Sequence, residues 1–204
     1  MKENLTEIAC IIDRSGSMQS IRSDAIGGFN AFLDGQRDVD GEANLSLVLF
    51  NDTYEMLHEC VDIQKMPELD EKTYVPGGST ALLDAVGRTI DDLGHRLDNT
   101  PEALRPGKVI VAILTDGMEN ASRVYDYEKV SQMIQHQKEA YQWEFIYLGA
   151  NQDAIKEAEK LSIQAQDTRA WNADRVGTSR AFYAMSAVVR ERREAPRKGK
   201  HDKK

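Results

Sequence analysis

Two unbroken apolar segments define the framework that this sequence predicts. Residues Ile8–Ile12 (IACII) and Val109–Leu114 (VIVAIL) show no polar alternation, which is typical of parallel strands covered by helices on both faces. Each segment ends at polar residues, the first at Asp13 and the second at Thr115-Asp116. We therefore expect two central strands whose carboxyl ends carry acidic and hydroxyl side chains.

The segments between and after these strands have helical periodicity. Their apolar residues recur at steps of three and four, which is typical of helices that pack one face on a sheet. The first of these helices is expected to follow Ser17 and to end near Asp38, the third near Tyr141, and the last to run from about Thr178 or earlier. The apolar stripes consist of Met18, Ile21, Ala25, Phe29 and Phe32; Leu83, Val86, Ile90, Leu93 and Leu97; Val130, Met133 and Ile134; Ala154, Ala158 and Leu161; and Phe182, Met185 and Val189.

Four further segments are predicted strands: Leu45–Phe50, Tyr54–Val61, Trp143–Leu148 and, as a short last strand, Ile163–Asp167. The first two are joined by a tight turn, so they form a hairpin that ends in an antiparallel edge strand. Trp171 is placed in a loop, where an exposed contact and a structural role are equally compatible with the sequence. The alternation of strands and helices predicts a doubly wound α/β domain, with a Rossmann-like, mostly parallel six-stranded sheet and helices on both faces.

The charge is unevenly distributed along the chain. The net charge is −8, but residues 190–204 carry +5, so residues 1–189 carry −13. An acidic body argues against a nucleic-acid groove and is compatible with cation binding. We expect one domain over residues 1–194, followed by a basic, disordered tail over residues 195–204 (APRKGKHDKK). Nucleic-acid binding is expected, if anywhere, only through this tail.

The sequence also indicates where the protein resides. No apolar run approaches the ~20 residues that a membrane span needs, and the first ten residues, MKENLTEIAC, lack the features of a secretory signal. The two cysteines, Cys10 and Cys60, do not make a disulfide framework. We therefore expect a cytoplasmic protein without a membrane partner.

Five polar residues carry the candidate chemistry: Asp13, Ser15, Ser17, Thr80 and Asp116. Taken singly, Ser17 and Thr80 are explained as N-caps of the first and second helices, and Asp116 as turn chemistry. Taken together they are expected to meet, because ligands of open α/β sheets bind outside the carboxyl ends of strands, where the strand order reverses. Carboxylate and hydroxyl oxygens favour a hard divalent cation such as Mg²⁺.

The charge balance of this set indicates a purpose. Two carboxylates offset a +2 ion, whereas three hydroxyls add no charge, so the metal stays electrophilic. A coordination position left to water can then accept a carboxylate from another protein. The set therefore predicts a site that binds an acidic residue through a metal.

The spacing of these residues resembles a known family. The run from Asp13 to Ser17 (DRSGS) matches the DxSxS signature of von Willebrand factor A domains, and Thr80 in GGSTALLDAV and Asp116 in TDGMEN resemble the rest of the family's metal-ion-dependent adhesion site. The similarity covers roughly Glu3–Leu148. It implies the sheet order 3-2-1-4-5-6, direct metal contacts from Ser15, Ser17 and Thr80, and contacts from Asp13 and Asp116 that are often water-mediated. The segments FIYLGANQDA and GTSRAFYAMSAVVR further resemble small stand-alone bacterial and phage versions of the domain.

The resemblance implies a Mg²⁺-dependent protein-binding module, for adhesion or as a scaffold, with Mn²⁺ or Ca²⁺ as alternative metals. Its metal would be completed by an Asp or Glu of a partner, for example an AAA+ ATPase or a stress-response or phage protein. We do not expect an enzyme, because the sequence has no GxSxG elbow and no histidine near the metal motifs to act as a base. Metal-assisted hydrolysis of a phosphate ester, and a structural subunit with an idle metal site, remain as alternatives.

Overall fold

The structure, a computed structural model, describes residues 1–150 and 153–196. Its strands form one sheet in the order β3-β2-β1-β4-β5-β6, in which only the β2–β3 pair is antiparallel. The sheet order and the antiparallel edge agree with the prediction. The strands are β1 (Lys2–Asp13), β2 (Glu42–Phe50), β3 (Tyr54–Asp62), β4 (Pro106–Thr115), β5 (Glu144–Ala150) and β6 (Thr168–Trp171).

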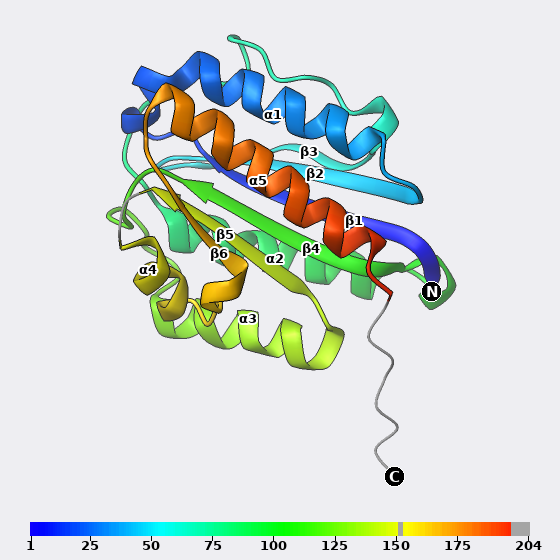
Figure 1. Cartoon of the computed structure of the whole chain (residues 1–204). Coiled ribbons are helices and arrows are strands. Elements are labelled where there is room, and N and C mark those ends of the chain that lie inside the picture. The colour runs from blue at the N-terminus through cyan, green and yellow to red at the C-terminus, as the bar shows by residue number, and fades with distance from the viewer. Residues whose placement is uncertain (151–152, 197–204) are drawn as a thin grey trace.

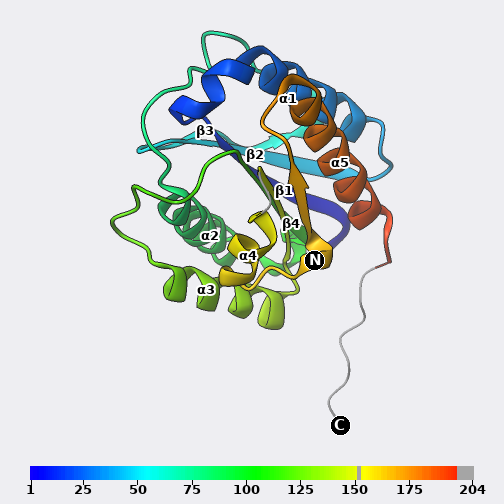
Figure 2. The ribbon, with the colours of Figure 1, turned by 60° about the vertical axis from the view of Figure 1, so that its left-hand side comes forward.

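Helices cover both faces of this sheet, as Figures 1 and 2 show. On one face lie α1 (Arg22–Arg37) and α5 (Arg175–Glu194), which pack against each other. On the other face lie α2 (Leu82–Asp98), α3 (Tyr127–Tyr141) and α4 (Ala154–Lys160). The predicted doubly wound α/β class is therefore confirmed.

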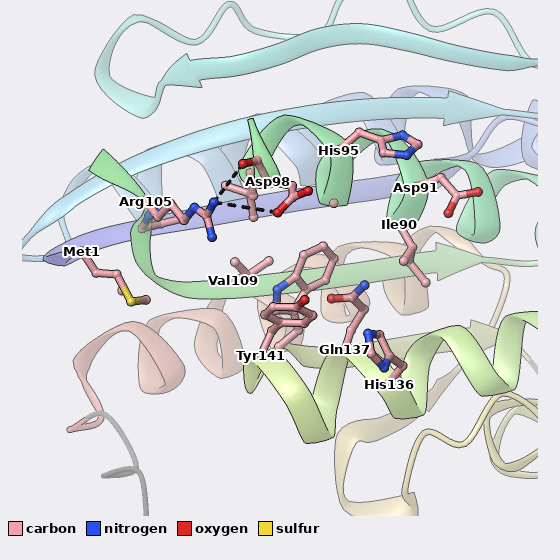
Figure 3. Close-up of a pocket in the computed structure, with 15 residues that line it drawn as sticks. Met1, Ile90, Asp91, His95, Asp98, Arg105, Val109, His136, Gln137 and Tyr141 are labelled. Carbon is pink, nitrogen blue, oxygen red and sulfur yellow. Dashed lines mark hydrogen bonds and ion pairs between the residues drawn. The ribbon is translucent and has the colours of Figure 1, made fainter. Parts of the chain in front are cut away.

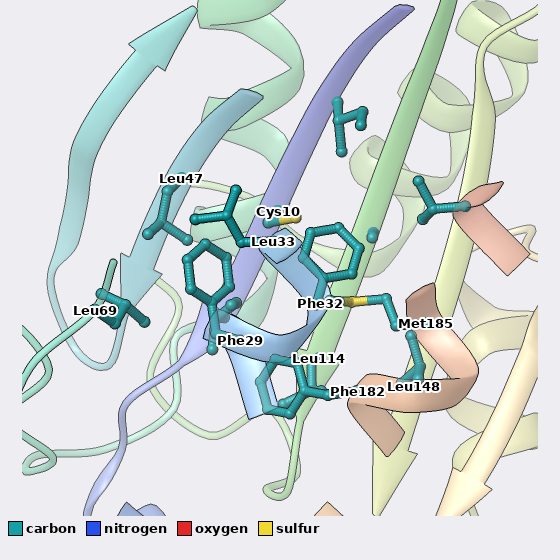
Figure 4. Packing of buried hydrophobic residues seen from close by; sticks show 14 of the residues in the cluster. Cys10, Phe29, Phe32, Leu33, Leu47, Leu69, Leu114, Leu148, Phe182 and Met185 are labelled. Carbon is teal, nitrogen blue, oxygen red and sulfur yellow. The ribbon is translucent and has the colours of Figure 1, made fainter. Parts of the chain in front are cut away.

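The unbroken apolar runs are explained by two cores, one on each face. In β1, Ile8, Cys10 and Ile12 belong to the core under α1 and α5, whereas Ala9 and Ile11 belong to the core under α2 and α3. Figure 4 shows the first core, where aromatic rings of α1 and α5 pack over the central strands. Because both faces of β1 are buried over Ile8–Ile12, no position in this run favours a polar side chain.

The last strand lies later in the chain than the sequence predicts. Ser162 has a φ of 59°, and the backbone N–H of Ile163 donates to the carbonyl of Ala158 at 2.9 Å, so these residues close the C-terminus of α4. The Ile163 side chain packs into the core beneath that helix. Strand β6 therefore begins only at Thr168, and Trp171, which the sequence places in a loop, is its buried last residue.

The two hydroxyls that the sequence offered as helix caps do not cap helices. A 3₁₀ helix over Gly16–Ile21 precedes α1, and Ser17 lies inside it. At the start of α2 the capping position is Ala81, and the backbone N–H of Leu83 is bound instead by the Glu119 carboxylate at 2.9 Å. Neither Ser17 nor Thr80 is therefore explained by helix capping.

In residues 1–150 and 153–196, every helix is too short or too polar to span a lipid bilayer. Helix α5 ends at Glu194, and the predicted basic tail lies outside the described residues from position 197 onward.

Candidate functional site

The site lies where the strand order reverses. Strand β1 is paired with β2 on one side and with β4 on the other, all three parallel. After β1 the chain continues toward β2, whereas after β4 it continues toward β5. The loops that follow β1 and β4 therefore run in opposite directions along the sheet, and this reversal is where open α/β sheets bind their ligands. Asp13 is the last residue of β1, and Asp116 directly follows β4.

The carboxylate of Asp13 is held from two sides. Its Oδ1 accepts the backbone N–H of Ser15 at 2.6 Å, and its Oδ2 accepts the hydroxyl of Thr115 at 2.6 Å. The backbone carbonyl of Asp13 accepts the hydroxyl of Tyr74 at 2.5 Å. Asp13 has no exposed surface, so these contacts fix the orientation of its carboxylate before any ligand binds.

A chain of hydroxyls connects the loop after β1 to the loop after β4. Ser15 Oγ and Ser17 Oγ are 3.1 Å apart, and Ser17 Oγ donates to Asp116 Oδ1 at 2.7 Å. Ser15 is buried, whereas Ser17 is exposed. The polar cluster thus begins inside the protein and opens to solvent at Ser17.

Thr80 reaches the same cluster from a third segment. The backbone N–H of Gly16 donates to the carbonyl of Gly78 at 3.0 Å, and Gly78 has a φ of 75°, which favours glycine. Thr80 donates its backbone N–H to Asn120 Oδ1 at 2.9 Å. A Cβ on Gly117 would lie 2.8 Å from Thr80 Oγ1, so the Thr80 hydroxyl lies against the residue that follows Asp116. All five predicted residues therefore lie close together at the carboxyl ends of the central strands β1 and β4.

No basic side chain of residues 1–150 and 153–196 pairs with the carboxylates of Asp13 and Asp116. Burial raises the pKa of Asp13 to about 6, and the neighbouring charge of Asp116 contributes to the rise. Burial also raises the pKa of Asp116. The arginine within the motif, Arg14, is paired with Glu55 at 2.5 Å, and neither aspartate has an ion-pair partner in the described part of the chain. A bound cation would remove the electrostatic penalty of keeping both carboxylates charged.

The donor set fits a hard divalent cation. It comprises two carboxylates and three hydroxyls, and these are oxygen ligands of the kind that Mg²⁺, Mn²⁺ and Ca²⁺ prefer. Within residues 1–150 and 153–196, no group of three or more His, Cys, Asp or Glu side chains is placed to hold a metal. A metal here would therefore depend on the hydroxyls as well as on the two carboxylates. The role of the five residues as ligands stays a prediction.

Four residues outside the predicted ligand set support the site: Tyr74, Thr115, Glu119 and Asn120. The carboxylate of Glu119 accepts the backbone N–H of Ser122 in its own loop at 2.8 Å and that of Leu83 in α2 at 2.9 Å, so it fastens the loop after β4 to α2. Thr115 and Asn120 have a sequence signal, since they flank Asp116 at the end of a buried strand. Tyr74 has none, because 61 residues separate it from Asp13.

The cavity in Figure 3 lies away from this site. It has a volume of about 300 Å³ and lies between α2, α3 and the start of β4. Ile90, Val109 and Trp143 form part of its apolar lining, and His95 and His136 are among its polar residues. None of the five predicted residues lines it, so this cavity does not belong to the candidate metal site.

Comparison with solved structures identifies the fold. The chain is similar to proximal thread matrix protein 1 from the mussel byssus with a zinc-occupied MIDAS (metal-ion-dependent adhesion site) motif, at 15% identity and a TM-score of 0.61, over 93% of this chain and 47% of that protein. It is also similar to the vWF domain of the type V pili tip protein Mfa5 from Porphyromonas gingivalis, at 10% identity and a TM-score of 0.65, over 95% of this chain and 98% of that one. A third similar structure is the manganese-loaded TRAP protein of Plasmodium vivax, at 15% identity and a TM-score of 0.62, over 91% of this chain and 72% of that one.

These likenesses show that the chain has the von Willebrand factor A fold. The chain spans about half the length of the mussel protein. No protein-family model and no curated protein matches the sequence. At 10–15% identity, the comparisons establish the fold alone, and the function has to be argued from the site.

Proposed function

We propose that this chain is a Mg²⁺-dependent protein-binding module, used for adhesion or as a scaffold, in which an Asp or Glu of a partner protein completes the coordination of the metal. The residues that would hold the metal are Asp13, Ser15, Ser17, Thr80 and Asp116. The observation that carries the proposal is the convergence of these oxygen donors from three loops, around two buried carboxylates that no basic side chain of the described residues neutralises. Mn²⁺ and Ca²⁺ are alternative metals, since they prefer the same donors.

The chain's own residues prepare the site. The Thr115 hydroxyl and the Ser15 N–H orient the Asp13 carboxylate, and the Ser17 hydroxyl orients Asp116. The metal, when bound, supplies an electrophilic centre for a carboxylate. By its resemblance to von Willebrand factor A domains, we infer direct metal contacts from the three hydroxyls and water-mediated contacts from the two aspartates.

The comparisons support the binding of a divalent metal, but they do not indicate which metal this chain binds. The mussel protein carries zinc in its adhesion-site motif and the Plasmodium protein is manganese-loaded, so structures of this fold hold divalent metals. For this chain, Mg²⁺ is inferred from the oxygen-only donor set. A cytoplasmic location, a bacterial or phage origin, and a partner such as an AAA+ ATPase or a stress-response or phage protein are proposed from the sequence resemblance.

Metal binding is tested with matched threonine variants. Isothermal titration with Mg²⁺ should show binding to the wild type and a loss of about tenfold or more in affinity for Thr80→Val. Thr89→Val is the control, because Thr89 is buried in α2 and its hydroxyl donates to the carbonyl of Ala85 at 2.7 Å. Equal Mg²⁺ affinities for the two variants would show that Thr80 is not a metal ligand. No Mg²⁺ binding to the wild type would overturn the proposal.

Partner binding is tested by capture from a native lysate in Mg²⁺, with elution by EDTA and Asp13→Ala as the control bait. We expect a protein that EDTA releases and that the variant does not retain. A partner that stays bound in EDTA and on the variant would place the interface elsewhere on the molecule.

The hydrolase alternative has no observation in its favour. Among the described residues, none of the contacts that build the site involves a histidine that could act as a base. A phosphatase assay with Mg²⁺ decides between the two functions. Turnover that Asp116→Ala abolishes would favour hydrolysis over protein binding.

A further inference from the structure

Thr80 differs from the two aspartates of the candidate site in how the fold places it. Asp13 is the last residue of β1 and Asp116 directly follows β4, so the sheet itself fixes both carboxylates. Residues 77–81, which we call the Thr80 segment, belong to no helix or strand, although Thr80 is buried. Groups outside the Thr80 segment therefore set the position of its hydroxyl.

Asn51 holds the Thr80 segment from the end of β2. It is the first residue after that strand. Its amide nitrogen donates to the carbonyl of Gly77 at 2.7 Å, and its backbone carbonyl accepts the N–H of Ala81 at 2.7 Å. Its side-chain oxygen accepts the backbone N–H of Thr53 at 2.9 Å, which fixes the direction of the amide group. Asn51 therefore binds the Thr80 segment on both sides of Thr80.

Asn120 holds Thr80 itself from the loop after β4. Its side-chain oxygen accepts the backbone N–H of Thr80 at 2.9 Å, and its own backbone N–H donates to the carbonyl of Thr80 at 3.0 Å. The two residues thus exchange a pair of hydrogen bonds, although 40 positions separate them in the sequence. Because the same loop begins at Asp116, these bonds fix Thr80 relative to the second aspartate.

The two asparagine side chains use opposite ends of their amide groups. Asn51 donates through its nitrogen to a carbonyl, whereas Asn120 accepts through its oxygen from an N–H. Within residues 1–150 and 153–196, the amide nitrogen of Asn120 makes no hydrogen bond. An ionised aspartate has two acceptor oxygens and no donor. Aspartate can therefore take over the contact of Asn120 with Thr80, but it cannot take over the contact of Asn51 with Gly77.

We propose that Asn51 and Asn120 are positioning residues, which place the Thr80 hydroxyl for a divalent cation. This inference rests on the proposed function and extends the site beyond its candidate ligands. Residues that orient a metal ligand typically change the affinity for the metal by about 10–100-fold when they are replaced. A displaced Thr80 would remove one neutral oxygen from the site and leave both carboxylates in place.

Asparagine-to-aspartate variants test this inference, because each adds one negative charge beside the Thr80 segment. Asn120→Asp keeps an acceptor for the Thr80 N–H, and its charge attracts a cation, so it should bind Mg²⁺ at least as tightly as the wild type. Asn51→Asp sets a carboxylate against the carbonyl of Gly77 and should displace the Thr80 segment. In isothermal titration, Asn51→Asp should therefore bind Mg²⁺ about tenfold or more weakly than Asn120→Asp.

Asn30→Asp is the matched control for a loss of stability alone. The side chain of Asn30, in α1, donates to the carbonyl of Leu69 at 3.0 Å and accepts its N–H at 2.8 Å. Asn30→Asp removes the same kind of donation as Asn51→Asp, in a contact that includes none of the five candidate ligands. Urea denaturation in EDTA should show a loss of stability for both variants, whereas the Mg²⁺ affinity should fall only in Asn51→Asp.

Asn120→Ala removes the acceptor for the Thr80 N–H without adding a charge. It should bind Mg²⁺ more weakly than both the wild type and Asn120→Asp. Hydrogen exchange in EDTA gives a readout that does not depend on metal: the Thr80 amide should be protected in the wild type and in Asn120→Asp, and it should exchange faster in Asn120→Ala.

The outcomes separate the two proposals. If the wild type binds Mg²⁺ and the two aspartate variants at positions 51 and 120 bind it equally well, the inference is overturned and the proposed function stands. Equal Mg²⁺ affinities of Asn120→Ala and Asn120→Asp, or of Asn51→Asp and Asn30→Asp, would overturn the inference in the same way. If the wild type does not bind Mg²⁺, the proposed function fails, and the inference fails with it.

Discussion

Replacing Asp13 with Asn removes a buried charge and keeps the shape of the side chain. In the variant, the amide oxygen can accept the Ser15 N–H that Oδ1 accepts now, at 2.6 Å. The amide nitrogen can donate to Thr115 Oγ1, which lies 2.6 Å from Asp13 Oδ2. The hydroxyl hydrogen of Thr115 can then turn to the carbonyl of Gly117, 3.1 Å away. The substitution therefore changes the charge while every hydrogen bond keeps a partner.

Without metal, we expect Asp13→Asn to be more stable than the wild type at neutral pH. Burial raises the pKa of Asp13 from its ordinary 3.8 to about 6. Between pH 3.8 and about 6, the folded state therefore keeps a proton that the unfolded state has released. The free energy of unfolding of the wild type falls as the pH rises through this interval. The difference between the two pKa values corresponds to about 3 kcal/mol of unfolding free energy at pH 7. Below about pH 4 the two proteins should be equally stable.

Mg²⁺ should affect the two proteins differently. At a concentration one hundred times its dissociation constant, a ligand specific to the folded state stabilises it by about 2.7 kcal/mol. The wild type should show a stabilisation of this kind, and Asp13→Asn should show little of it because one of the two carboxylates is lost. The stability difference seen in EDTA should thus shrink or close in Mg²⁺.

Urea denaturation between about pH 4 and pH 8, in EDTA and in Mg²⁺, measures both effects. Asp52→Asn is the control, since Asp52 is exposed beside the same loops and its replacement should change stability by no more than about 0.5 kcal/mol. A variant at position 13 that is less stable than the wild type in EDTA at pH 7 would refute the argument from burial. Equal stabilisation of variant and wild type by Mg²⁺ would show that Asp13 does not contribute to metal binding.

Two further predictions concern the fold itself. A Cβ on Gly177 would lie 1.9 Å from the carbonyl oxygen of Asn172, so Gly177→Ala should displace the start of α5 and lower the Tm. Gly27→Ala, which has nothing within 4 Å of the new Cβ, should stabilise α1 by roughly 0.5–1 kcal/mol, and equal melting curves for the two variants would contradict this reasoning. Cys10 is fully buried, and burial raises the pKa of its thiol well above the usual range, so Ellman's reagent should modify only the half-buried Cys60 of the native protein. Reaction of native Cys60→Ser with the reagent would show that Cys10 is accessible.

Much of the fold could be predicted from local patterns. Residues 8–12 and 109–114 predict central strands because a strand buried on both faces needs apolar side chains at every position. The helices follow from stripes at steps of three and four, and the turn between Leu45–Phe50 and Tyr54–Val61 predicts the antiparallel edge. The five candidate ligands were also identifiable, because each follows or precedes a strongly patterned element. In each case the signal lies in neighbouring residues and does not depend on the rest of the chain.

The remaining features depend on segments far apart in the sequence, so they emerge when the chain folds. From the sequence, the Ser17 hydroxyl could accept a helix N–H or donate to an acid elsewhere in the chain. Because β1 packs beside β4, it donates to Asp116, 99 residues away. Tyr74 supports Asp13 only because the connection between β3 and α2 folds back over the end of β1. The short strand β6 starts after Ile163 has ended α4 by a hydrogen bond to Ala158. It forms where the chain can pair with β5. Periodicity predicts which face of an element is buried, but the partner of each polar group is set by which segments the folded chain brings together.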